Sequence, residues 1–170
     1  DLPDRMSCET AFGFSPARVA RFHRVKVGSA EHDQILEKYI QMLADSHVGV
    51  YRWGKGDFPK LSWENAQDPE RAEPKFDWLE FDDAHAEMWG RFHCNAFRIP
   101  IEGLGNGFQD GFQAGKICGV PATNAVYQTL MGKYLGAFEE HLRQKGWLDT
   151  SYVYWFDEPQ QKCYRFVNAG

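Results

Sequence analysis

Two adjacent carboxylates, Asp157 and Glu158, stand directly after an apolar aromatic run and directly before Pro159. Carboxyl groups are common general acids and bases, so this pair is the first candidate for chemistry in the chain. The run, residues 152–156, is β-branched and aromatic, which is typical of a strand buried on both faces of a parallel sheet. Ligands collect at the carboxyl ends of such strands. The sequence therefore predicts a site at Asp157 and Glu158.

Pro159 constrains the backbone of this candidate site. Its ring disfavours a helical conformation at Glu158, so we expect Glu158 to be extended. The alternative is that one of the two acids only caps a following helix. Successive side chains on a regular strand face opposite ways, so both acids can reach one ligand only if the strand twists or breaks there. Which acid points into a pocket stays open.

Composition excludes several other classes of protein. The chain has 170 residues, 43% of them hydrophobic and 25% charged, as in one globular domain with a sizeable core. The net charge is −5 and the basic residues are scattered, so no nucleic-acid surface is indicated. No apolar run approaches the roughly 18 residues that a membrane span needs. The chain has neither an initiator Met nor a hydrophobic signal core, so we expect a mature form or an excised piece.

Metal and nucleotide motifs are absent from the sequence. The four cysteines form no C-x-x-C pair and the six histidines form no H-E-x-x-H, so no metal or other cofactor is expected and the thiols are expected to be free and buried. The glycines of residues 103–107 do not fit G-x-G-x-x-G, and residues 111–116 are one residue short of a phosphate-binding loop. We expect neither segment to bind a nucleotide.

The elements that must position the acids alternate between strands and helices. We expect strands at 6–14, 47–54, 94–100 and 152–156, and helices from Ser29 to about Asp45, from Asp82 through Trp89, and from Thr123 or Asn124 to Gly146. Residues 16–28 give no clear pattern. Two long stretches, 55–75 and 101–122, look irregular because they are rich in Pro, Gly, Asn and charge.

This alternation predicts an α/β fold with a parallel sheet, whose strands near Cys8, Val50, Phe97 and Tyr154 lie side by side in that order. A closed (β/α)₈ barrel needs about 250 residues. We therefore expect residues 1–170 to form a single partial barrel domain, the first half of a (β/α)₈ barrel truncated after its fourth strand. A complete small open sheet of four strands is the alternative.

The motif Trp155-Phe-Asp-Glu-Pro159 resembles glycoside hydrolase family 123, the β-N-acetylgalactosaminidases with a barrel catalytic domain. Two further segments are similar to that family, Phe76-Asp-Trp-Leu-Glu-Phe-Asp82 and Asn95-Ala-Phe-Arg-Ile-Pro100. The similarity spans roughly residues 76–159. The β-sandwich domains usual in the family are absent from this chain.

The resemblance implies a glycosidase that removes terminal β-linked N-acetylgalactosamine. Glu158 is then the general acid/base, and Asp157 assists the substrate's own 2-acetamido group as it attacks the anomeric carbon. A fixed carboxylate suits this role, because the acetamido N–H becomes positive as an oxazoline forms. The scheme needs no enzyme nucleophile. The resemblance also implies a secreted or periplasmic location and a glycan as the binding partner.

Four residues near the predicted strand ends are candidates for sugar contacts. They are Arg52, Trp53, Arg98 and Tyr154. Core packing is the alternative for Trp53, because large aromatic side chains are usually mostly buried.

Two other functions stay open at the level of the sequence. The first is a retaining barrel glycosidase in which Glu158 is still the acid/base and the nucleophile lies beyond this chain. The second is a carbohydrate-binding fragment without activity. In either case, a missing C-terminal half or a second copy is the expected partner that completes the barrel, because a half barrel leaves an apolar sheet edge exposed.

Overall fold

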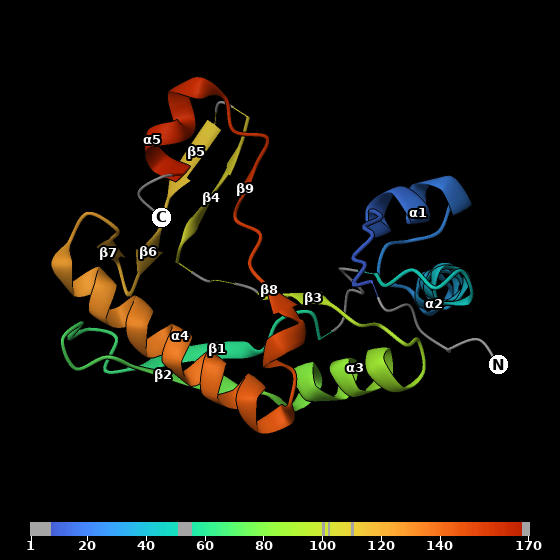
Figure 1. The fold of residues 1–170 in the computed structure, drawn as a ribbon, viewed down its shortest axis with the longest axis horizontal. Coiled ribbons are helices and arrows are strands. Elements are labelled where there is room, and N and C mark those ends of the chain that lie inside the picture. Colours follow the sequence, from blue (N-terminus) through green and yellow to red (C-terminus); the bar gives the residue numbers. More distant parts are fainter. Residues whose placement is uncertain (1–7, 51–55, 100, 102, 110, 168–170) are drawn as a thin grey trace. The chain divides into compact units, whose positions relative to one another are not determined.

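The computed structural model describes residues 8–50, 56–99, 101, 103–109 and 111–167, with the backbone alone at Phe166. Figure 1 labels its helices and strands. The chain forms two compact units. The first unit comprises residues 1–59, 77–98 and 150–152, and the second comprises residues 60–76, 99–149 and 153–170. Each unit thus combines segments that are distant in the sequence.

Three helices lie in the described part of the first unit. Helix α1, Pro16–His23, begins at Ser15, whose hydroxyl accepts a hydrogen bond from the backbone N–H of Arg18. Residues 16–28 gave no clear pattern in the sequence, and this two-turn helix buries only Val19 and Ala20. Helix α2, Ala30–Asp45, begins at Ser29 as predicted, and the Ser29 hydroxyl accepts from the N–H of His32.

Helix α3, Leu79–Gly90, begins earlier than the sequence predicted. Asp82 lies in its first turn and is not its N-cap, which is Trp78. A carboxylate inside the first turn still interacts favourably with the positive end of the helix. The backbone N–H of Leu79 donates to Asp77 Oδ1 at 3.2 Å, so Asp77 supplies the acceptor that we expected from Asp82.

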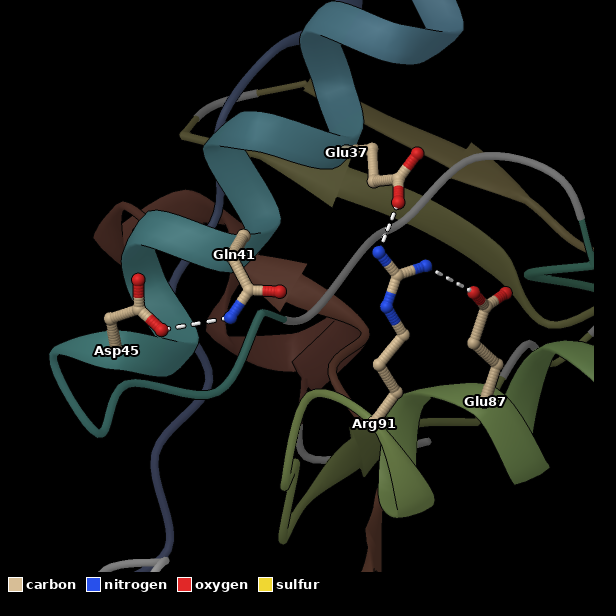
Figure 2. A network of polar contacts seen from close by, with 5 residues as sticks. All are labelled: Glu37, Gln41, Asp45, Glu87 and Arg91. Atoms are coloured by element: carbon tan, nitrogen blue, oxygen red, sulfur yellow. Dashed lines mark hydrogen bonds and ion pairs between the residues drawn. The ribbon is translucent and has the colours of Figure 1, made fainter.

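An ion-pair network joins α2 to α3. The Arg91 guanidinium, just after α3, donates to Glu37 of α2 and to Glu87 of α3, the latter at 3.0 Å (Figure 2). The two carboxylates raise the pKa of Arg91 above its usual value. A separate contact within α2 lies nearby in Figure 2, where Gln41 Nε2 donates to Asp45 Oδ1 at 2.8 Å. The side chains of this network are about half exposed, so it contributes little to the stability of the fold.

Strand pairing in the first unit is parallel. Phe12 forms a parallel bridge with Val50. Strand β3, Phe97–Arg98, pairs in parallel with β8, Ser151–Tyr152. These contacts agree with the predicted parallel pairing of first with second and third with fourth strand, although the paired segments are much shorter than expected. One cluster of buried residues in this unit comprises Ile40, Val50, Met88, Phe92 and Cys94.

The second unit is built around α4, Ala125–Lys145, the longest helix among the described residues. It begins at Asn124 and ends at Gly146, as predicted, and Asn124 Oδ1 accepts from the N–H of Val126 at 2.9 Å. Five residues on one face of this helix are buried: Tyr127, Leu130, Tyr134, Phe138 and Leu142. They share a face because they recur at intervals of three and four residues, which is the period of an α-helix.

Strands occupy both stretches that looked irregular in the sequence. The first stretch contains β1, Lys60–Glu64, which pairs with β2, Glu73–Asp77. Lys133 of α4 holds β2, because its ammonium donates to the Ala72 carbonyl at 2.9 Å and lies 2.8 Å from a Glu73 carboxylate oxygen. The Phe76 ring packs on the Phe138 ring, with 5.7 Å between centroids. The expectation of irregular backbone was wrong here.

The second stretch contains four short strands. Strands β4, Gly105–Phe108, and β5, Gly111–Ala114, pair antiparallel, as do β6, Lys116–Ile117, and β7, Val120–Pro121. Strand β9, Phe156–Asp157, adds to β4 in parallel, which gives the order β5-β4-β9 seen in Figure 1. The fold is therefore mixed α/β with parallel and antiparallel pairs, and the half barrel expected from the sequence stays a prediction.

The aromatic run at 152–156 is not one buried strand. It is divided between β8, which ends at Tyr152, and β9, which begins at Phe156. The residues between them include Val153 and Tyr154, which are 53% and 47% exposed. The division between the two units also falls here, after Tyr152. High β-propensity means that a side chain fits a pleated, half-buried surface. Whether the segment has such a surface to pack on depends on the rest of the fold.

The C-terminal part of the described chain has three short helices. They are the 3₁₀ helices Leu148–Thr150 and Gln161–Cys163, labelled η1 and η2, and the α-helix α5, Tyr164–Val167. Cys94 and Cys163 are buried, as expected, whereas Cys8 is exposed and Cys118 is half-buried. None of the helices in the described part of the chain is both long enough and apolar enough to cross a membrane.

Candidate active site at the end of strand β9

The backbone around Asp157 is held by one residue, Gln109, which follows β4. Phe108 is the register partner of Asp157. The N–H of Gln109 donates to the Asp157 carbonyl at 2.9 Å, and the N–H of Gln160 donates to the Gln109 carbonyl at 3.0 Å. The segment between Asp157 and Gln160 is thus pinned at both ends to the same residue. Its conformation is set by this clamp.

Within the clamp, Glu158 has a left-handed backbone with φ of 46°. The expectation of an extended Glu158 was therefore wrong. Non-glycine residues seldom adopt positive φ, and such a residue typically costs on the order of 1–3 kcal/mol unless its surroundings impose the conformation. The two Gln109 hydrogen bonds supply that constraint. The break that the sequence required for two adjacent acids thus occurs at Glu158.

The two acids differ in exposure. Asp157 is half-buried at the end of β9, whereas Glu158 is exposed. Neither side chain caps the next helix, because the N-cap of η2 is Gln160 and no side-chain cap is present there. The capping alternative is therefore wrong.

Tyr154 and Asp157 are brought together. The Tyr154 hydroxyl donates to Asp157 Oδ1 at 2.6 Å. This length is typical of an O–H donor on a carboxylate, which is among the stronger hydrogen bonds in proteins. Both residues were predicted from the sequence as site residues, but no sequence signal indicated that they contact each other.

Aromatic rings and one glycine support β9 from the side of β4 and β5. The Phe156 ring stacks on the Phe112 ring at 6.4 Å between centroids, and Trp155 meets each of them edge-on. Gly107 faces the Phe156 ring directly, because a Cβ placed at residue 107 would lie 2.0 Å from Phe156 Cε2. The chain therefore needs glycine at 107 for β9 to pack on β4.

Sequence reasoning missed Gln109, Gly107 and Phe112 as parts of the site. The available signal was the glycine-rich stretch at 103–111, which we interpreted only as irregular. Glycines inside a strand often mark close backbone approach. Gly105 is a second case, since its φ is 83° and a Cβ there would meet the Gln113 carbonyl oxygen at 2.1 Å.

The hydrogen bonds and ring contacts described above do not test the other residues that were predicted to bind sugar. Arg98 lies in β3 of the first unit, where Tyr152 is its register partner. Arg52 and Trp53 lie outside the described residues. No group of three or more His, Cys, Asp or Glu side chains that could hold a metal ion occurs among the residues that the structure describes.

A comparison with protein families gives a match over the C-terminal part of the chain. Residues 107–169 match the family described as "Glycoside hydrolase 123, catalytic domain". The matched segment begins at Gly107 and contains β9, Asp157 and Glu158. No curated protein matches the chain. This match confirms the resemblance seen in the sequence over residues 107–169, which are similar to the glycoside hydrolase 123 catalytic domain.

Proposed function

We propose that the chain belongs to a glycosidase that removes terminal β-linked N-acetylgalactosamine with participation of the substrate's 2-acetamido group. The observation that carries this proposal is the acid pair at the end of β9, in which Glu158 is held with φ of 46° inside a matched glycoside hydrolase segment. Glu158 is exposed and caps no helix, so its carboxyl group is accessible to a substrate.

In this proposal Glu158 is the general acid/base. As the glycosidic bond breaks, the leaving oxygen takes a proton from the Glu158 carboxyl group, and the resulting carboxylate later accepts a proton from the attacking water. Its exposure suits this task, because the group must meet both a leaving alcohol and water.

Asp157 stabilises the intermediate. The acetamido oxygen attacks the anomeric carbon and forms a C–O bond to it, while the C–O bond to the leaving group breaks. The acetamido nitrogen becomes positive as this happens. The Asp157 carboxylate accepts a hydrogen bond from that N–H, which lowers the energy of the transition state that leads to the oxazoline. Water then opens the oxazoline with retention of configuration. No covalent bond to the enzyme forms.

The first test compares two aryl substrates. An aryl β-N-acetylgalactosaminide should be cleaved, and the matching aryl β-galactoside, which has no internal nucleophile, should scarcely react. Asp157→Asn should lower kcat/KM on every acetamido substrate. Glu158→Gln should lower it by about 10² to 10⁴ for poor leaving groups and far less for activated ones, which need little protonation. Asp149→Asn, at an exposed acid in η1, is the matched control and should leave the rates unchanged.

Two results would contradict the proposal. Equal rates on the two sugars together with a trapped covalent glycosyl-enzyme would favour the ordinary retaining mechanism with an enzyme nucleophile. Binding of carbohydrate without turnover of any aryl glycoside would favour a non-catalytic carbohydrate-binding fragment.

A further inference from the structure

We propose that Tyr154 is a positioning residue that acts on the substrate through Asp157. This inference rests on the proposed function and gives Tyr154 a task different from the direct sugar contact predicted from the sequence. The observation behind it is the 2.6 Å hydrogen bond from the Tyr154 hydroxyl to Asp157 Oδ1.

The backbone hydrogen bonds do not fix the orientation of the Asp157 carboxylate. Gln109 fixes the main chain at Asp157, since its N–H binds the Asp157 carbonyl at 2.9 Å. That contact does not restrict rotation of the carboxylate about its side-chain bonds. The Tyr154 hydroxyl engages one carboxylate oxygen, Oδ1, and so leaves the other oxygen to meet the acetamido N–H. Catalytic groups need this kind of orientation to within a fraction of an ångström.

Burial does not explain why this hydrogen bond exists. Tyr154 is 47% exposed, so water can satisfy a hydroxyl at this position about as well as a carboxylate can. The bond also links a residue of the segment between β8 and β9 to the residue that ends β9. The hydrogen bond therefore contributes more to the geometry of Asp157 than to the stability of the fold.

The test measures binding of a thiazoline analogue of N-acetylgalactosamine, a stable mimic of the oxazoline, by calorimetry. The variants are Tyr154→Phe, Asp157→Asn and the double variant. Tyr154→Phe should weaken binding by up to about 10-fold, because a carboxylate that Tyr154 no longer holds must be ordered when the ligand binds. In the Asp157→Asn background, Tyr154→Phe should have almost no further effect on binding, because the carboxylate that the tyrosine orients is already replaced by an amide. Tyr164→Phe, at another exposed tyrosine of the same unit, is the control and should bind like the parent.

The outcomes separate this inference from the proposed function. Unchanged binding by Tyr154→Phe, or an equal loss in both backgrounds, would overturn the positioning role while the proposed function stands. An equal loss in both backgrounds would indicate a direct sugar contact. If the parent protein does not bind the thiazoline, the proposed function fails and the inference fails with it. Circular dichroism of each variant establishes that it is folded before its binding is compared.

Discussion

Glu158 combines two properties that single residues rarely share, a left-handed backbone and a candidate catalytic side chain. Its φ of 46° is imposed by hydrogen bonds from and to Gln109 on either side. Glycine adopts positive φ without steric cost, so a glutamate at this position is less favourable for the backbone than a glycine. Retaining glutamate here therefore sacrifices some stability for the carboxyl group.

Glu158→Gly should accordingly make the protein more stable and less active. Removal of the side chain relieves the strain, and we expect a gain of up to about 1 kcal/mol in the free energy of unfolding. Urea denaturation measures the gain, and hydrolysis of a poor-leaving-group substrate measures the loss of acid catalysis. Glu158→Gln keeps the strain and provides the control, since its stability should match the parent. A clear loss of stability in Glu158→Gly would show that the strain is not real.

Gly107 is the second single residue on which the site depends. Gly107→Ala would place a methyl group 2.0 Å from the Phe156 ring and should force β9 away from β4. We expect a loss of about 1–3 kcal/mol, the usual range for overpacking, together with loss of activity because Asp157 follows Phe156. Gly136→Ala in α4 is the control, because a Cβ there meets nothing within 4 Å and alanine favours helices. Equal stability of the two variants in urea denaturation would contradict the packing of β9 described here.

At the scale of elements, α4 is the main support of the second unit. One face of it is buried, and Leu130 is fully buried at 0% exposure. Tyr127 on the same face donates from its hydroxyl to the Gly103 carbonyl at 2.8 Å, and burial raises the pKa of Tyr127 above its usual value. The helix thereby connects to the glycine-rich stretch that leads into β4.

Leu130→Ala tests this arrangement. Deleting a fully buried leucine side chain leaves a cavity and should lower the free energy of unfolding by about 2–5 kcal/mol. Leu135→Ala, at a position of the same helix that is 39% exposed, has the same chemistry and should lower it by well under half as much. Urea denaturation of both variants gives the comparison. Similar losses of unfolding free energy in the two variants would contradict the burial of Leu130 on this face of α4.

At the scale of the whole molecule, the first unit leaves several large apolar side chains in solvent. Phe12, Phe22, Val27 and Leu79 are each more than half exposed, and Phe22 reaches 78%. Exposed apolar side chains that gather in one patch are typical of surfaces that bind another protein segment. A second copy or a further segment that completes a barrel stays our proposal for what covers them.

Sedimentation velocity over a range of concentrations tests this proposal. The 170-residue chain should associate as its concentration rises, because burial of these side chains is favourable. The double variant Phe22→Ser and Leu79→Ser should shift the distribution towards the monomer. A parent chain that sediments as a single monomeric species at every concentration would contradict the proposal.

The sequence by itself determined the parts of this protein that depend on local interactions. Helices α2 and α4 begin and end where Ser29, Asn124 and Gly146 indicate, because capping bonds span only a few residues. The buried face of α4 followed from its spacing for the same reason. The acid pair and the motif of residues 155–159 were also readable, since both lie in contiguous residues.

The tertiary structure alone decided the pairing of β9 and the conformation of Glu158. Both depend on Gln109, which is distant in the sequence, and pairing between distant strands leaves no local pattern. The aromatic run was divided for the same reason, because the two ends of the run pair with different strands, β3 and β4. A sequence pattern predicts that a segment is suited to a strand, whereas only the folded chain supplies its partner.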